Sequence, residues 1–359
     1  MIKYLGSKRL IADQITGIVG AWPTARSVVD LFSGTSRVGH ALKRAGLRVL
    51  SNDYAAYAHA LATCYVQADA DDWLIPAEIL ISELQHTPPS PGYFTETFCV
   101  ESRFFTPENG ARIDAIRDEI GRRALPPELH AIALVSLMEA ADRVDSTTGV
   151  QMAYLKGWAP RASKPLTLRV PALLPRATAG RGVALCEDAV TAAQHLSADV
   201  AYLDPPYNQH SYLGNYHIWE TLVRWDAPEA YGVARKRVDT RSRPSPFNSR
   251  RGCSDAMAAI INAIDAELLI VSFNNEGFVS RDEMIQLLSR RGDVLVVERD
   301  FKRYVGAQIG IYSPKGARVG EVGHLRNTEY LFVAGPASAL DPVRHLMGEP
   351  ALEPGAAHA

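Results

Sequence analysis

The chain has 359 residues, of which 47% are hydrophobic and 22% charged, a composition typical of a globular enzyme. Its formal net charge of −2 argues against a protein that coats nucleic acid through bulk charge. The four cysteines form no C-x-x-C pair and the histidines show no ligand-like spacing, so we expect neither a disulfide framework nor a metal site. With no apolar stretch long enough to span a membrane and no secretory signal at the start, we expect a cytoplasmic protein.

The first predicted unit is a strand, a glycine turn, a helix and a second strand. Residues 27–32 are short, apolar and β-branched, as in a buried parallel strand, and a Ser-Gly-Thr-Ser turn follows them. A helix with apolar positions from Val38 to Ala45 comes next and stops at a glycine. Residues 47–53 then form a second strand that ends on an acid, which completes a βαβ unit.

The same alternation resumes after residue 181. Further strands are predicted at 182–186, 200–203, 268–273, 294–297 and 330–333. Strands that alternate with helices predict an α/β fold with a doubly wound, mostly parallel sheet. Such sheets bind ligands at the carboxyl ends of their strands. Polar residues stand at these ends, namely Asp30, Asp53, Asp188, Asp204 and Asn274.

The interruption at residues 54–181 has a different character. Segments 55–66, 108–123 and 127–141 combine helical periodicity with good helix formers. Residues 146–181 carry several prolines, so we expect a helical insertion with an irregular edge.

Two stretches of the chain are strongly basic. Residues 146–181 contain six Lys and Arg and no acid, and residues 235–251 contain seven against a single acid. Either stretch alone would be read as a solvated face. Two of them in a chain of negative net charge indicate charge segregation toward a polyanion. The residues that we expect to contact it are Arg161, Lys164, Arg169, Arg235, Arg237 and Arg241.

The sequence Asp204-Pro205-Pro206-Tyr207 directly follows the predicted strand at 200–203. An ordinary turn could use these residues. The alternative is a site for a planar amine, whose lone pair is delocalised into its ring. A carboxylate and a backbone carbonyl that each accept one N–H would free that lone pair for attack. The prolines fix φ and contribute no N–H, so the turn presents carbonyls at its mouth.

Three acids at strand ends outline a second part of the same site. Asp30 lies beside Gly34, where glycine allows a ligand to approach the backbone. Asp53 ends a strand where such folds bind a ribose, and Asp188 could accept a bond from an adenine amine. Together they predict a site for a nucleoside with a charged amino-acid tail. The turn lacks G-x-G-x-x-G, so a dinucleotide is the weaker interpretation.

With these motifs in this order, the chain resembles the N6-adenine-specific DNA methyltransferases of the Dam-like group, in the alpha class of amino-methyltransferases. The resemblance runs to about Val333. It implies a Rossmann-like methyltransferase fold with S-adenosyl-L-methionine as cofactor. The domains it implies are a methyltransferase domain at 1–53 and 182–335, a helical target-recognition and DNA-binding insertion at 54–181, and a flexible tail at 336–359.

The resemblance also implies residue roles. Asp204 and the Pro205 carbonyl would polarise the amine, Pro206 would complete the motif, and Tyr207 would stack on the flipped base. Residues 3–9 look like the family's N-terminal cofactor segment. The implied cofactor-binding residues are Tyr4, Lys8, Asp30, Phe32, Gly34, Thr35, Asp53 and Asp188. One departure is Ser36, which stands where many relatives have a second glycine.

We therefore expect methylation of adenine N6 in double-stranded DNA by base flipping. The protein would act as a monomer, either as an orphan methylase or beside a restriction endonuclease that works independently. Cytosine-N4 and RNA adenine-N6 methyltransferases are the neighbouring alternatives. A DNA-binding protein without catalysis is the alternative from another class, and a protein-glutamine methyltransferase would need Asn in place of Asp204.

Overall fold

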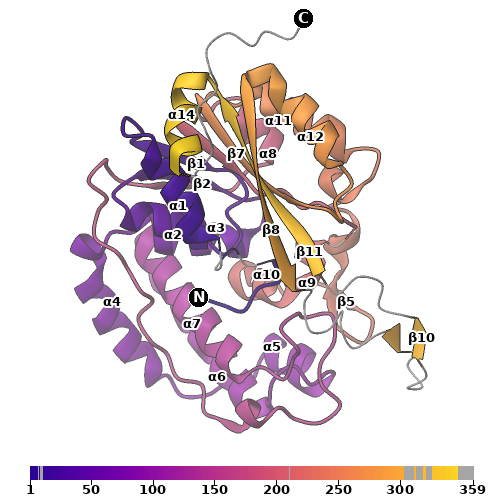
Figure 1. The fold of residues 1–359 in the computed structure, drawn as a ribbon. Helices are drawn as coiled ribbons and strands as arrows, with labels where there is room; N and C mark the ends of the chain where they lie inside the picture. The colour runs from indigo at the N-terminus through magenta and orange to yellow at the C-terminus, as the bar shows by residue number, and fades with distance from the viewer. Residues whose placement is uncertain are drawn as a thin grey trace, which may run out of the picture.

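The computed structural model describes residues 1–6, 8, 11–209, 211–302, 311–312, 318–320 and 326–346. A seven-stranded sheet with the order β3-β2-β1-β4-β7-β11-β8 forms its centre (Figure 1). The strands are β1 (Ser27–Asp30), β2 (Arg48–Asn52), β3 (Val183–Leu185), β4 (Val200–Leu203), β7 (Leu268–Asn274), β8 (Asp293–Lys302) and β11 (Arg326–Gly335). Strand β11 runs antiparallel to both of its neighbours, whereas the other pairs are parallel. The predicted mostly parallel α/β sheet is confirmed.

Alternate residues of the central strands serve two separate hydrophobic cores. On one face, Val28 and Ile270 pack with helices α1 (Ala12–Ala21), α2 (Arg37–Arg44) and α14 (Ala337–Leu346). On the other face, Val29 and Val271 pack with α8 (Ala189–Ala193), α11 (Cys253–Ala263) and α12 (Arg281–Leu288). A central strand that is buried on both faces needs apolar residues at every position, and β4 has Val-Ala-Tyr-Leu, all buried.

A third core lies in the helical insertion, which Figure 1 shows beyond the strands' carboxyl edge. Its helices are α3 (Ala56–Ala62), α4 (Ala70–Gln85), α5 (Tyr93–Thr95), α6 (Pro107–Arg122) and α7 (Pro127–Val144), with π-helical turns at Thr63–Gln67 and Glu96–Val100. Thr106 caps α6 by accepting from the Asn109 N–H, and Pro107 occupies the first turn, where its missing N–H costs nothing. The helices predicted from periodicity are therefore present.

The insertion shares this third core with segments outside it. Helix α10 (His217–Arg224), which follows the Asp-Pro-Pro-Tyr motif, contributes buried residues to the same cluster, as does Ile2 near the start of the chain. The remaining elements are α9 (Tyr212–Asn215), β5 (Ala230–Tyr231), β6 (Lys236–Arg237), β9 (Ile311–Tyr312), β10 (Arg318–Gly320) and 3-10 turns at Pro160–Ser163, Val238–Arg241, Pro246–Asn248 and Ser289–Arg291.

The prediction of a flexible tail at 336–359 is wrong for residues 337–346. Residues 337–346 form helix α14, which packs against α1 and the strands β8 and β11. Ala339, Leu340 and Val343 are buried there, so an Ala-rich and Pro-rich composition concealed an amphipathic helix. Residues 347–359 lie outside the described part of the chain. Within the described residues, no helix combines the length and the apolar character that a membrane crossing requires.

Candidate active site

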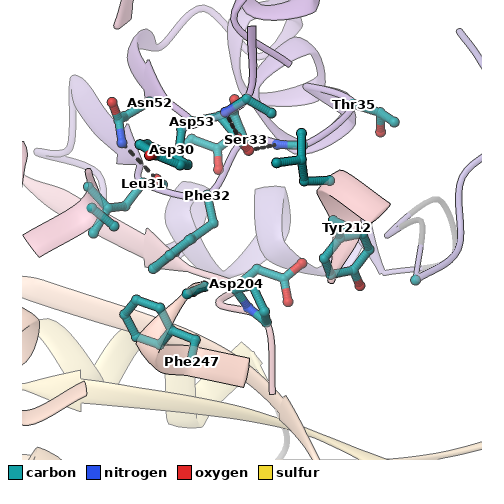
Figure 2. Close-up of a pocket in the computed structure, with 18 of the residues that line it drawn as sticks. Asp30, Leu31, Phe32, Ser33, Thr35, Asn52, Asp53, Asp204, Tyr212 and Phe247 are labelled. Atoms are coloured by element: carbon teal, nitrogen blue, oxygen red, sulfur yellow. Dashed lines mark hydrogen bonds between the residues drawn. The ribbon is translucent and has the colours of Figure 1, made fainter. Parts of the chain in front are cut away.

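A cavity of about 320 Å³ opens at the carboxyl edge of the sheet (Figure 2). Every predicted cofactor-binding residue lines it: Tyr4, Lys8, Asp30, Phe32, Gly34, Thr35, Asp53 and Asp188. From the Asp-Pro-Pro-Tyr motif, Asp204 and Pro206 line it as well. Pro205, Tyr207 and Asn274 are not among the lining residues. The carboxyl ends of adjacent parallel strands share one edge, and this brings residues far apart in sequence into one cavity.

The turn after β1 needs left-handed backbone at two positions. Gly34 has φ +49°, and a Cβ there would lie 3.6 Å from the Tyr4 ring. Ser36 has φ 57°, a conformation that favours glycine. The departure from the second glycine is therefore accommodated by a serine in the left-handed region, and the helix α2 begins directly after it.

Backbone N–H groups from two different segments hold the Asp53 carboxylate in place. Its two carboxylate oxygens accept from the Gly34 N–H at 2.9 Å and the Ala55 N–H at 3.0 Å. Burial raises the pKa of Asp53 to about 6, although these two hydrogen bonds oppose the rise. A carboxylate fixed in this way at the end of β2 can accept hydrogen bonds from a pair of hydroxyl groups.

Asp30 is 1% exposed, and neither carboxylate oxygen has a hydrogen-bond partner within the described residues. Burial raises its pKa to about 8, the charges of Asp204 and Asp53 add to the rise, and the nearby backbone N–H of Gly39 opposes it. An unpartnered buried carboxylate is costly unless a ligand pairs with it. Its position in the cavity wall suits a ligand that carries an ammonium group.

Asp204 forms an ion pair with Lys8, whose Nζ lies 3.1 Å from Asp204 Oδ1. The same ammonium group also contacts Glu329 on β11. Burial raises the pKa of Asp204 to about 6, against the attraction of Lys8. Lys8 lies in the segment predicted to bind the cofactor, and its charged end faces the carboxylate of the predicted catalytic motif. Residues 7 and 9 of that segment lie outside the described part of the chain.

Tyr4 and Tyr212 bring aromatic rings to the cavity wall. Tyr4 is stacked between Tyr216 and Tyr212, with ring centroids 4.4 Å and 5.2 Å away. Tyr207 packs edge-on against Phe273 at 5.7 Å. Tyr212 lines the cavity, whereas Tyr207 does not. Tyr212 is therefore a second candidate, besides the predicted Tyr207, for the ring that stacks on the base.

A segment that the sequence analysis did not assign to the site closes one side of the cavity. Residues 243–248, which we call the strap, all line it. The Arg243 guanidinium lies 4.2 Å from the centre of the Tyr54 ring and 3.2 Å from Glu220 Oε1. Asn248 donates to the Asn208 carbonyl at 2.7 Å. The only sequence signal was Arg-Pro-Ser-Pro-Phe, a rigid irregular segment shortly after the catalytic motif.

Asp188 follows β3 and caps helix α8, where it accepts from the Val190 and Thr191 N–H groups. It is exposed and lines the cavity. Capping and ligand contact can coexist, because a carboxylate has about four acceptor positions. Among the described residues, no group of three or more His, Cys, Asp and Glu side chains could hold a metal ion.

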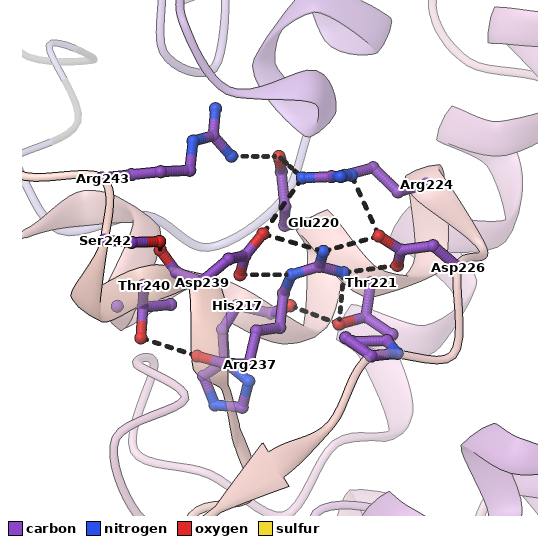
Figure 3. Close-up of polar contacts among 12 residues, drawn as sticks. His217, Glu220, Thr221, Arg224, Asp226, Arg237, Asp239, Thr240, Ser242 and Arg243 are labelled. Carbon is purple, nitrogen blue, oxygen red and sulfur yellow. Dashed lines mark hydrogen bonds and ion pairs between the residues drawn. The ribbon is translucent and has the colours of Figure 1, made fainter.

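The structure contradicts the prediction that Arg237 contacts DNA phosphates (Figure 3). Its guanidinium donates to Asp226 at 2.6 Å and 2.7 Å and to Asp239 at 3.0 Å, and its side chain is 2% exposed. A buried guanidinium paired with two carboxylates is not available to DNA. The hairpin of β5 and β6 brings these partners together, which a count of charges cannot reveal.

The other five predicted contacts differ in their surroundings. Arg161 donates to Asp145 at 2.8 Å, and Arg235 forms an ion pair with Glu101. Arg241 lies over the Tyr231 ring at 3.7 Å. Lys164 and Arg169 are exposed, in the irregular segment that follows α7.

The mostly parallel sheet with this cavity at its carboxyl edge is consistent with a Rossmann-like methyltransferase fold, and the family match identifies the class as a methyltransferase. Residues 4–275 match the family described as D12 class N6 adenine-specific DNA methyltransferase, and the chain belongs to that family. Relatives include the type II methyltransferase M.NlaIII of Neisseria lactamica, 30% identical over 84% of this chain and 92% of its own length. M.CviAII of Paramecium bursaria Chlorella virus 1 is 27% identical over 84% and 92%. M.FokI of Planomicrobium okeanokoites is 29% identical over 81% of this chain but only 47% of its own length.

Proposed function

We propose that the chain transfers a methyl group from S-adenosyl-L-methionine to adenine N6 in double-stranded DNA, with the base flipped into the cavity. The observation that carries the proposal is the meeting of Asp204 with the unpartnered Asp30 and the backbone-held Asp53 in one cavity. The proposed site is thus built for an amine on one side and a charged nucleoside on the other.

The cofactor supplies the methyl group from its sulfonium. Asp30 would pair with its ammonium group, Asp53 would accept from the ribose hydroxyls, and Asp188 would accept from the adenine amine. Tyr4 and Phe32 would supply apolar surface, and Gly34 and Thr35 would let the ligand approach the backbone. Arg243, stacked on Tyr54, is a further candidate contact at the Asp53 end.

Asp204 would accept one N–H of the target amine and the Pro205 carbonyl the other. This pulls the nitrogen toward tetrahedral geometry and returns its lone pair to the nitrogen. The carboxylate need not be a strong base, because methylation itself makes the nitrogen acidic. Positioning of the amine supplies much of the rate enhancement. Either Tyr207 or Tyr212 would stack on the extruded ring.

A base inside a duplex must be flipped out, which costs a few kcal/mol. Exposed basic residues, among them Lys164, Arg169 and Arg241, would supply phosphate contacts that hold the duplex while the base is out. We propose a monomer that acts in the cytoplasm, with any cognate restriction endonuclease acting independently. The names of the relatives as type II methyltransferases support such a setting.

The test is to incubate purified protein with labelled cofactor and duplex DNA, then digest the DNA to nucleosides for mass spectrometry. We expect N6-methyldeoxyadenosine from the wild type. Asp204→Ala should lose at least about 100-fold in rate while it still binds S-adenosylhomocysteine. N4-methyldeoxycytidine would favour the cytosine enzyme, and transfer to RNA alone would favour the RNA enzyme. Binding of DNA and cofactor without any transfer would indicate a protein that lacks catalysis.

A further inference from the structure

The Lys8 ammonium group lies between two carboxylates. Its Nζ is 3.1 Å from Asp204 Oδ1, and it donates a hydrogen bond to Glu329 Oε1. The Lys8 side chain is 9% exposed, and each carboxylate partner is 18% exposed. Ser272 on β7 donates to the same Glu329 oxygen at 3.0 Å. The carboxylate of the proposed catalytic residue is thus one end of a largely buried Asp-Lys-Glu-Ser chain.

The direction of β11 explains how Glu329 reaches this site. Strands β4 and β7 are parallel and bring their carboxyl ends to the cavity edge, whereas β11 is antiparallel and brings its beginning there. In the register of the sheet, Glu329 lies opposite Asn274 at the end of β7. Alternation along β11 places Glu329 on the same face as Leu331 and Val333, which is the face of α1 and α14.

A lysine shared between two carboxylates solves an electrostatic problem at this site. A buried Asp204 would tend to take up a proton, and a protonated carboxyl is a poor acceptor for an amine N–H. A lysine devoted to Asp204 alone would keep it ionised, but it would also neutralise the charge that the amine must feel. Glu329 draws the ammonium group toward itself, and Ser272 fixes Glu329 in place.

We propose that Glu329 is a positioning residue that divides the positive charge of Lys8 between two carboxylates and so sets the acceptor strength of Asp204. This inference rests on the proposed function. Glu329 lies beyond residues 4–275, the part of the chain that matches the family. Within the described residues, the ion pair with Lys8 is the contact that joins Glu329 to Asp204, and the negative charge of Glu329 also acts on Asp204 directly.

The charge of Glu329 and the charge of Lys8 act on Asp204 with opposite signs. Burial raises the pKa of Asp204, Lys8 lowers it and Glu329 raises it. Burial also opposes the charge on Lys8, but Asp204 and Glu329 outweigh it and hold the pKa of Lys8 well above its usual range. The other titratable groups around this chain are Asp30, Tyr202, Tyr207 and Tyr212.

The test is the pH dependence of kcat/KM for DNA methylation in Glu329→Gln and Lys8→Gln proteins. The acidic limb of this pH profile reports the protonation of Asp204. Removal of the Glu329 charge should move this limb to lower pH by about one unit, and removal of the Lys8 charge should move it to higher pH. Because Lys8 would then neutralise Asp204 more fully, Glu329→Gln should also lower the plateau kcat by about three- to tenfold. Glu329→Asp keeps the charge but shortens the reach, so its acidic limb and its kcat should both lie between those of the wild type and Glu329→Gln.

The matched control is Glu298→Gln, which removes the same charge from an exposed pair with Arg281 on the adjacent strand β8. It should leave both the limb and kcat unchanged. Affinity for S-adenosylhomocysteine, measured for each variant, reports whether the cavity is still folded. An acidic limb that stays in place or moves upward in a cofactor-binding Glu329→Gln protein would overturn the inference. Absence of adenine methylation by the wild type would instead overturn the proposed function.

Discussion

Phe247 packs edge-on against Phe32, with ring centroids 5.2 Å apart and ring planes at 83°. Phe32 belongs to the turn after β1, and Phe247 belongs to the strap, more than 200 residues further along the chain. The contact ties the predicted cofactor turn to the segment that also reaches the loop after Asp204 through Asn248. The strap therefore links the two halves of the cavity.

Truncation of this ring should loosen the cofactor turn. We expect Phe247→Ala to lower the free energy of unfolding by about 3 kcal/mol, as for other buried aromatic residues, and to weaken S-adenosylhomocysteine binding by roughly tenfold. Calorimetry and thermal unfolding measure the two effects. Phe332→Ala is the control, because Phe332 is buried in the same cluster but does not line the cavity. Equal losses of affinity in both variants would show that Phe247 acts through general stability alone.

The buried Asp30 predicts that cofactor binding depends on pH. Its pKa of about 8 means that the free protein carries a mostly protonated Asp30 at pH 7. An ammonium ligand needs the carboxylate, so binding should release a proton and the affinity should rise between pH 6 and pH 8. Titration calorimetry in buffers of different ionisation enthalpy measures that proton directly. Asp30→Asn should abolish the pH dependence and weaken binding; a dependence that survives in this variant would point to another group.

The raised pKa of Asp30 also predicts that replacing this residue by Asn stabilises the unliganded protein at high pH. Because the pKa of Asp30 is raised from 3.8 to about 8 in the folded state, its contribution favours folding at low pH and is lost progressively as the pH rises from about 4 to about 8. At pH 9 the unliganded Asp30→Asn protein should therefore melt higher than the wild type, by at least about 2 °C. At pH 5 the difference should shrink, because Asp30 is then protonated. Thermal unfolding at both pH values makes the comparison, and a lower melting temperature at pH 9 would contradict it.

The sequence was informative where local pattern and topology agree. Short apolar strands followed by Asp30, Asp53 and Asp204 implied one shared cavity, because parallel strands bring their carboxyl ends to the same edge. Glu329 was missed because β11 is antiparallel and delivers the residue at its beginning, not its end. A search for acids that extend the apolar stripe of a strand would have found it, since Leu331 and Val333 lie on the same face.

The strap and the basic runs show the limits of composition. The strap has no helical or strand periodicity, so nothing local indicates that it returns to the cavity. Arg237 and Arg241 stand four residues apart in one basic run, yet one is buried between carboxylates and the other lies over a tyrosine ring. Partners supplied by tertiary contacts decide which cations stay free for DNA, and sequence spacing does not carry that information.

This difference within one run yields the last prediction, which concerns DNA binding. If Lys164, Arg169 and Arg241 neutralise phosphates, binding should weaken steeply with salt. Each charge removed should lower the slope of log K against log salt by roughly one, so the triple alanine variant should lose about three. The loss of affinity should be similar on cognate and unrelated duplexes, because phosphate contacts carry no sequence information.

Arg237→Ala should behave in the opposite way. Its removal leaves Asp226 and Asp239 without their main partner, so we expect a loss of about 3 kcal/mol in the free energy of unfolding. The salt slope of the folded protein should not change, since this guanidinium is 2% exposed and cannot release counterions from DNA. Arg281→Ala, on the distant helix α12, controls for removal of an exposed positive charge. A salt slope that falls by one in Arg237→Ala would mean that the hairpin opens on DNA and frees this arginine, and an unchanged slope in the triple variant would mean that those three cations are only a solvated face.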